Sequence, residues 1–308
     1  MSNQTTLTEF LLLGFSDVRE LQILHFVVFL VIYLTAVMGN LLILTAVALD
    51  RQLHTPMYFF LGNLSFLDLC YISVTVPKAM ANSLTNNQLI SFSGCVAQVF
   101  LVITFVITEM TLLVVMAYDR YVAICHPLHY RVIMNTGTCA QMAAGSWICS
   151  VIYAAFHTGN TFRLSFCQSN AIDQFFCDIP QLLKISCTDT HPNEILNFLC
   201  VIFMCFSCFG LVTVSYTRIF ATVLRMPSAQ GRYRAFSTCL PHVTVVCLFL
   251  STGTFTYMKP SSGTPMYYDL LAAVLYTVLP PTVNPFIYSL RNREIKAALR
   301  KIGDMIYS

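Results

Sequence analysis

Long apolar segments alternate with short polar ones along the whole chain. Seven segments carry almost no charge: residues 24–49, 58–81, 96–118, 140–160, 195–217, 236–258 and 268–290. Each is long enough for an α-helix to cross the hydrocarbon layer of a membrane, which takes about 20 residues at 1.5 Å per residue. The pattern predicts an all-α membrane protein, a seven-transmembrane helix bundle that forms a single domain over residues 1–308.

The composition excludes an ordinary water-soluble protein. Hydrophobic residues make up 56% of the chain and charged residues 10%, whereas about a quarter of the residues of a soluble domain are charged. No internal repeat or linker interrupts the chain, which again favours a single domain.

The basic residues predict the orientation of the bundle. Of 17 Lys and Arg residues, 12 fall at one membrane face: Arg51, Arg120, Arg131, Arg218, Arg225, Arg232, Arg234, Arg291, Arg293, Lys296, Arg300 and Lys301. By the positive-inside rule this face is cytoplasmic, so the tail 1–23 lies outside and the tail 291–308 inside. The net charge of +3 therefore reflects topology, and we expect membrane lipid and no nucleic acid as a partner.

The two tails carry further signals. No cleavable signal peptide is visible, so the first span is expected to act as its own insertion signal. A sequon at Asn3 predicts N-glycosylation of the outer tail. In the inner tail, apolar residues recur at i, i+3, i+4 and i+7 beside basic ones, which predicts a short amphipathic helix on the membrane surface after the seventh span; they are Ile295, Ala298, Leu299 and Ile302.

Four of the 13 cysteines fall on the predicted outer side: Cys95, Cys167, Cys177 and Cys187. In an oxidising compartment they can pair in three ways, and the spacing does not choose among them. A zinc site made by the last three and His191 is an alternative. The other nine cysteines lie in or beside spans, where we interpret them as small packing residues.

Two acidic residues fall near the middle of spans. Asp68 and Glu109 are costly in a membrane and therefore mark function. Their repulsion is relieved if one is protonated, or if a sodium ion lies between them with Asn40 and Asn284 as further ligands. Alternatively, each acid is hydrogen-bonded separately to a neighbour.

Two other features indicate moving parts. Asp119 and Arg120 are adjacent at the end of the third apolar segment, which predicts an ion pair that faces the protein interior, although an ordinary charged helix end is the alternative. In the seventh segment, Pro280-Pro281 and Asn284-Pro285 predict two breaks where the helix can bend, or a static kink.

A set of motifs spans about residues 39–292 in a specific order. The chain resembles rhodopsin-like (class A) G-protein-coupled receptors and, more narrowly, tetrapod-type olfactory receptors. The matching motifs are Gly39-Asn40, residues 56–61 (PMYFFL) with Asp68, residues 116–130 (MAYDRYVAICHPLHY), residues 234–239 (RAFSTC) with His242, and residues 284–292 (NPFIYSLRN).

The resemblance implies roles for individual residues. It implies disulfides Cys95–Cys177 and Cys167–Cys187, and an internal sodium site at Asp68 and Glu109. The G-protein-coupling switch would use Asp119, Arg120, Tyr121, Tyr216, His242, Asn284, Pro285 and Tyr288. The implied partner is the olfactory stimulatory heterotrimeric G protein, which raises cyclic AMP.

The chain departs from the family pattern in the sixth span. Pro241 stands where a Ser is common, Phe249-Leu250-Ser251 where Phe-Tyr-Gly is common, and Arg234 where Lys is common. The first two put the sixth-helix switch in doubt, because Pro241 adds a kink and Leu250 removes an aromatic hydroxyl.

The expected ligand pocket is apolar. Val102 stands where amine receptors of this superfamily carry an Asp, and the absence of Lys from residues 270–290 excludes a retinal Schiff base. We therefore expect small, neutral, mostly apolar ligands. The expected lining residues are Val102, Ile103, Val106, Ile107, Cys200, Met204, Leu250, Gly253, Thr254, Tyr257 and Thr277.

The resemblance therefore implies an odorant receptor in the plasma membrane of sensory cilia, with no cofactor apart from the internal sodium. A receptor used for chemosensing outside the nose, or an ion-coupled transporter, is the alternative. Transporters usually show paired inverted repeats, whereas the breaks here lie mainly in the seventh span. An enzyme is not expected, since no nucleophile and base are clustered.

Overall fold

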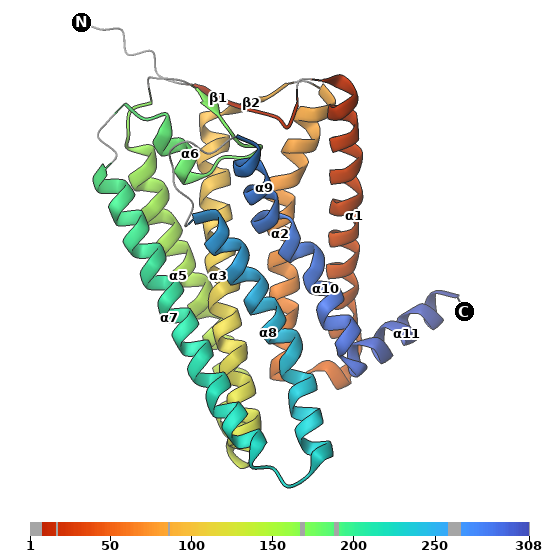
Figure 1. The fold of residues 1–308 in the computed structure, drawn as a ribbon. Helices are drawn as coiled ribbons and strands as arrows, with labels where there is room; N and C mark the ends of the chain where they lie inside the picture. The colour runs from red at the N-terminus through yellow and green to blue at the C-terminus, as the bar shows by residue number, and fades with distance from the viewer. Residues whose placement is uncertain are drawn as a thin grey trace, which may run out of the picture.

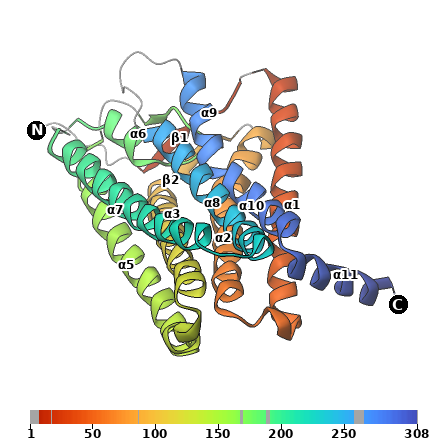
Figure 2. The ribbon, with the colours of Figure 1, turned by 60° about the horizontal axis from the view of Figure 1, so that its bottom comes forward.

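Long helices pack side by side in a bundle (Figures 1 and 2). The computed structural model describes residues 8–16, 18–85, 87–166, 170–187, 191–257 and 266–307. The seven spans predicted from the sequence are confirmed as helices long and apolar enough to cross a membrane. They are α1 (Arg19–Leu49), α2 (Pro56–Thr85), α3 (Phe92–Cys125), α5 (Thr136–Phe162), α7 (His191–Leu224), α8 (Ala229–Tyr257), and the pair α9 (Met266–Thr277) and α10 (Leu279–Arg291).

The seventh span is divided, as the prolines predict. Helix α9 ends at Thr277 and α10 begins at Leu279, with Val278 between them and a proline in the first turn of α10. Pro285 lies inside α10, which remains one helix around it. The helix is therefore interrupted just before Pro280-Pro281 and continues through Asn284-Pro285.

Helix α1 carries a glycine where it meets α10. A Cβ atom placed on Gly39 of α1 would lie 2.9 Å from Cβ of Pro285 in α10. Real Cβ atoms almost never come so close, because carbon atoms repel at that distance. Gly39 thus allows α1 to contact α10 at the level of the Asn284-Pro285 motif.

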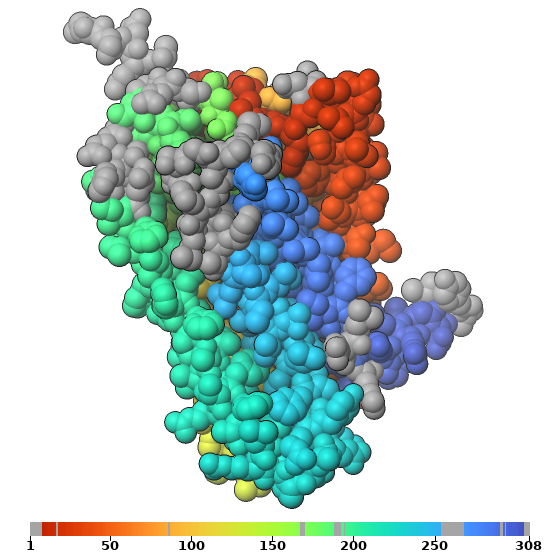
Figure 3. Space-filling view, in the orientation of Figure 1, coloured from red at the N-terminus to blue at the C-terminus, as the bar shows by residue number. Residues whose placement is uncertain are grey.

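The inner end carries short helical pieces and one amphipathic helix. The short pieces are η1 (Arg51–Leu53), η2 (Pro127–His129) and α4 (Tyr130–Ile133). Helix α11 (Arg293–Tyr307) extends sideways from the base of the bundle (Figures 1 and 3) and buries Ile295, Ala298 and Ile302, as the apolar spacing predicts. Its Lys301 donates to Asp50 Oδ2 at 2.8 Å, and this hydrogen bond lowers the pKa of Asp50.

A small sheet covers part of the outer end, which the apolar pattern did not predict. Strand β1 (Glu9–Leu12) lies between β2 (Leu89–Ser91), to which it is antiparallel, and β3 (Ala171–Ile172), to which it is parallel. Phe10 and Leu12 are fully buried below the sheet. The short helix α6 (Ile179–Lys184) follows β3 in the same outer loop.

Candidate functional site

A disulfide ties the top of α3 to the long outer loop. Cys95 is bonded to Cys177, which confirms this pairing. Both residues are fully buried, and the amide of Cys177 donates to Gln98 Oε1 at 2.8 Å. Cys187 is also disulfide-bonded, while Cys167 lies outside the described residues. The zinc alternative is wrong, because the sulfur of Cys177 is already bonded to that of Cys95.

The same loop is also joined to the seventh span. Asp178, the residue after Cys177, accepts hydrogen bonds from the hydroxyl of Tyr276 at 2.8 Å and from the amide of Ile179 at 2.9 Å. Burial raises the pKa of Asp178 to about 6, although both donors favour its charged form. The loop is thus held to both α3 and α9.

Asp68 and Glu109 face a common partner in the middle of the bundle. Nδ2 of Asn284 lies 3.1 Å from Asp68 Oδ2 and 3.3 Å from Glu109 Oε1, and all three residues are buried. Asn40 bonds instead to the carbonyls of Ala36 and Pro281. The alternative, in which each acid is hydrogen-bonded to a different neighbour, is therefore wrong, because both acids contact the same amide of Asn284.

Two of the residues expected to hold a sodium ion carry unpartnered amide oxygens. Oδ1 of Asn284 and Oδ1 of Asn40 are both buried without a hydrogen-bond partner among the described residues. Carboxylate and amide oxygens are the ligands that hard cations prefer. The described residues contain no group of three or more His, Cys, Asp or Glu that could hold a metal, so any ion here would also need amide oxygens or water.

The Asp119–Arg120 pair is closed at the inner end of α3. Nε of Arg120 donates to Asp119 Oδ2 at 3.0 Å, and a second guanidinium nitrogen contacts the same oxygen. Tyr130 of α4 donates to the other carboxylate oxygen at 2.7 Å. Burial and the charge of Asp119 raise the pKa of Tyr130 well above its ordinary value, so its hydroxyl stays a donor. Asp119 is buried, which excludes an ordinary exposed helix end.

A histidine connects three helices near this pair. Nε2 of His242 in α8 lies 2.9 Å from the carbonyl oxygen of Leu113 in α3, and its Nδ1 lies 2.7 Å from the hydroxyl of Tyr216 in α7. A carbonyl oxygen can only accept, so Nε2 carries the hydrogen and Nδ1 accepts from Tyr216. The hydroxyl of Tyr288 is buried without a partner among the described residues. Tyr121, another expected switch residue, has its hydroxyl 3.0 Å from Nε2 of His126.

The structure brings part of the expected ligand pocket together. Val102, Val106 and Leu250 belong to one buried apolar cluster, and Ile103 packs against a second cluster below the outer sheet. Among the other expected residues, Ile107, Cys200 and Met204 are half-buried. Thr277 is fully buried, and its hydroxyl donates to the carbonyl of Ala273 in its own helix at 2.6 Å.

The upper end of α8 offers space. A Cβ atom placed on Gly253 would meet no neighbouring atom of the described residues within 4 Å. The side chains of Thr254 and Tyr257 lie outside the described residues, as does Asn3 of the outer tail. Pro241 lies inside α8, which continues through it as one helix.

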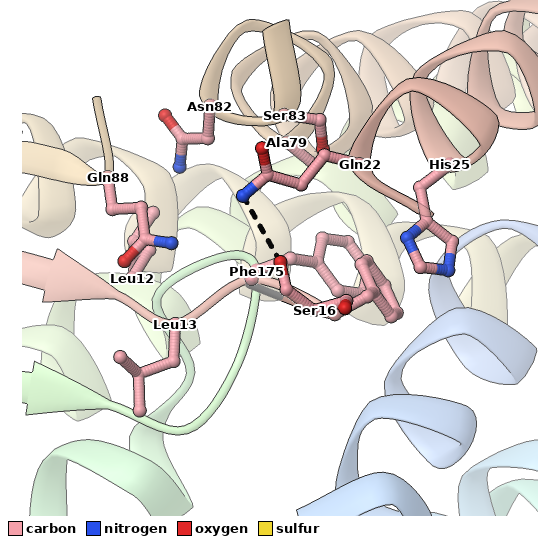
Figure 4. Close-up of a pocket in the computed structure, with 12 residues that line it drawn as sticks. Leu12, Leu13, Ser16, Gln22, His25, Ala79, Asn82, Ser83, Gln88 and Phe175 are labelled. Carbon is pink, nitrogen blue, oxygen red and sulfur yellow. Dashed lines mark hydrogen bonds between the residues drawn. The ribbon is translucent and has the colours of Figure 1, made fainter. Parts of the chain in front are cut away.

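The described residues line two pockets, and only the second shares a residue, Leu250, with the expected ligand site. The first is at the outer end between the segment after β1 and helices α1 and α2 (Figure 4), where Gln22 Nε2 donates to the carbonyl of Ser16 and His25 packs 5.1 Å from the ring of Phe15. The second is a wholly apolar pocket between α3, α7 and α8. Its lining residues are Met110, Leu113, Val114, Cys208, Phe209, Val212, Val246, Phe249 and Leu250.

The sequence patterns did not single out two polar residues that the structure pairs. His157 of α5 lies 2.5 Å from Asn197 of α7. The signal that could have found His157 is a histidine in the otherwise uncharged segment 140–160. Tyr130 ends the motif at residues 116–130, but the sequence does not predict its hydrogen bond to Asp119.

Comparisons with known proteins decide the family. The olfactory receptor family model matches residues 29–304, which is nearly the whole chain. The chain belongs to the olfactory receptor family. This olfactory receptor is 54% identical to human olfactory receptor 14A16 over 97% of its own length and 96% of that protein. It is 52% identical to human olfactory receptor 14C36 over its whole length and 98% of that protein.

Membership of the family confirms several expectations at once. The receptor is a multi-pass membrane protein of the seven-helix class, and its family is one of receptors and not of enzymes. Family members bind small odorants and signal through G proteins.

Proposed function

We propose that this olfactory receptor binds small, neutral, mostly apolar volatile molecules inside the helix bundle and activates the olfactory stimulatory G protein, which raises cyclic AMP. The observation that carries this proposal is the closed set of contacts around Asp119 at the inner end. A ligand that favours an opened bundle shifts a two-state equilibrium and frees Arg120 for the G protein.

The chemistry of the bundle supports a neutral ligand. Val102, Val106 and Leu250 are apolar, and burial of a charge against such residues without a partner is costly. A ligand of about ten heavy atoms at roughly 0.7 kcal/mol each binds with about 7 kcal/mol, a dissociation constant on the order of 10 µM.

Sodium is the proposed resident ion. Asp68, Glu109 and the unpartnered amide oxygens of Asn284 and Asn40 would hold it. When bound, the ion would neutralise the repulsion of the two carboxylates. Asn284 lies inside α10, so its contacts with both acids connect this cluster to the inner half of the seventh span.

The proposed location is the plasma membrane of sensory cilia, with Asn3 glycosylated on the outer tail. Use of the same receptor for chemosensing outside the nose remains the alternative. An ion-coupled transporter is disfavoured, since Asp68 and Glu109 both bond one amide in the buried core and mark no path through it.

Ligand-dependent cyclic AMP in transfected cells tests the proposal. A broad panel of volatile compounds is screened on the receptor and on Arg120→Ala, with surface expression measured for both. We expect at least one neutral compound to raise cyclic AMP through the receptor, and no response from the variant. A response that survives in Arg120→Ala, or one given only by charged amines, contradicts the proposal.

A further inference from the structure

His157 lies at the interface of α5 and α7 and is almost fully buried, with 3% of its surface exposed. Its Nδ1 lies 2.5 Å from Oδ1 of Asn197 in α7. The ring of Tyr153, one turn away in α5, packs on the histidine with 4.2 Å between ring centroids. These contacts hold the imidazole in one orientation.

The bond to Asn197 determines which ring nitrogen carries the hydrogen. An amide oxygen can only accept, so Nδ1 of His157 is the donor. In the neutral ring Nε2 is then a bare acceptor. It is buried and has no hydrogen-bond partner among the described residues. A buried acceptor left unpaired costs about 1–3 kcal/mol, so this nitrogen favours any buried molecule that can donate to it.

The partner of His157 lies on a face of α7 that the expected ligand pocket uses. Asn197, Cys200 and Met204 are spaced i, i+3 and i+7 in α7 and therefore share one face of that helix. Helix α3, which carries Val106 and Ile107, packs against both α5 and α7. The His157–Asn197 pair therefore meets the face of α7 that carries two of the expected lining residues, Cys200 and Met204.

We propose that Nε2 of His157 accepts a hydrogen bond from the hydroxyl group of the ligand, so that this receptor prefers aliphatic alcohols to ethers of the same size. The inference rests on the proposed function, because it names the chemical class of its ligand. The alkyl chain of the alcohol would lie against Val106 and its neighbours. A water molecule at Nε2 is the competing occupant.

Nuclear magnetic resonance of the full-length receptor in lipid nanodiscs tests binding without signalling. The receptor carries ¹⁵N-labelled histidine, and the Nε2 resonance of His157 is assigned as the one that disappears in His157→Gln. The probes are the n-alkanols from butanol to decanol and, for each, its isomeric methyl ether, such as 1-hexanol and 1-methoxypentane. We expect saturable shifts of this resonance with alkanols and none with ethers.

A cyclic AMP assay with matched variants provides the second readout. We expect alkanols to be at least about tenfold more potent than their isomeric ethers, which corresponds to one hydrogen bond of about 1.4 kcal/mol. His157→Phe should abolish this ratio by weakening the alkanols alone. Ser150→Ala, a buried position on the same helix whose hydroxyl bonds its own backbone, should keep the ratio.

The outcomes separate the two proposals. No shift of the His157 resonance with any alkanol means that water is the only occupant and overturns this inference, as does a retained potency ratio in His157→Phe at normal surface expression. If His157→Phe fails to reach the surface, the resonance of the unmodified receptor decides. Saturable shifts without any rise in cyclic AMP uphold the inference and contradict the proposed signalling.

Discussion

The hydroxyl of Tyr216 lies 2.7 Å from Nδ1 of His242, across the interface of α7 and α8. Because Nε2 of the same ring bonds the carbonyl of Leu113, one imidazole connects three helices. Nδ1 can accept only from a donor that faces it, so movement of α8 away from α7 breaks this bond.

Tyr216→Phe removes that donor and leaves a buried acceptor unpaired in the closed bundle. The closed state should lose about 1–2 kcal/mol, so cyclic AMP without ligand should rise by about tenfold relative to surface-expressed receptor. Ser215→Ala is the matched control, because this hydroxyl bonds the carbonyl of Leu211 in its own helix. Equal basal signals from the two variants would contradict the role of Tyr216.

Tyr130→Phe tests the contact of α4 with the ion pair. Its hydroxyl donates to Asp119 at 2.7 Å, and hydrogen bonds to charged groups contribute about 1.5–3 kcal/mol. Loss of this bond should loosen Asp119 and raise ligand-independent cyclic AMP, whereas Arg120→Ala should abolish the signal. A variant with unchanged basal signal and unchanged dose response would show that Tyr130 does not hold Asp119 in the closed state.

Gly39→Ala tests the close approach of α1 and α10. The added methyl group would lie 2.9 Å from Cβ of Pro285, and such overpacking typically costs about 1–3 kcal/mol. The melting temperature of the purified receptor should fall. At Gly62 the nearest atom to an added Cβ is 3.8 Å away, so Gly62→Ala should melt as the unmodified receptor does. Equal effects of the two variants would contradict the contact.

The stability of the receptor should depend on pH through Asp178. Its pKa in the folded receptor is about 6, above the ordinary value of 3.8, because the carboxyl group is buried. The folded state therefore favours the protonated form, and this contribution is complete below pH 3.8 and is lost as the pH rises through 6.

Asp178→Asn provides the measurement, because asparagine is neutral at every pH. The melting temperature of the receptor minus that of this variant should fall between pH 4 and pH 7 and level off above that range. A difference that is constant over the whole range would contradict the raised pKa.

Two substitutions test the ligand pocket itself. Val106→Trp adds bulk next to Val102, one turn away on the same face of α3, and Tyr257→Phe removes a hydroxyl expected at the outer end of α8. Each should weaken activation by the best ligand while surface expression is unchanged. Normal responses from both variants would refute the pocket.

The sequence by itself determined the membrane spans and the family. Runs of about 20 apolar residues cross a membrane as helices, since a backbone in lipid must satisfy its own hydrogen bonds. The amphipathic spacing of Ile295, Ala298 and Ile302 was equally decisive, because a helix buries whichever stripe is apolar. The Pro280-Pro281 break was also predictable from chemistry along the chain.

Only the tertiary structure decided which distant polar groups meet. Asn284 reaches both Asp68 and Glu109, and His157 faces Asn197, because helices far apart in sequence pack side by side. Strand β1 is too short and irregular to be visible as a pattern and is held by partners from two other loops. Periodicity reports which face of a helix is apolar, whereas the partner of a buried polar atom depends on the rotation and depth of its neighbours.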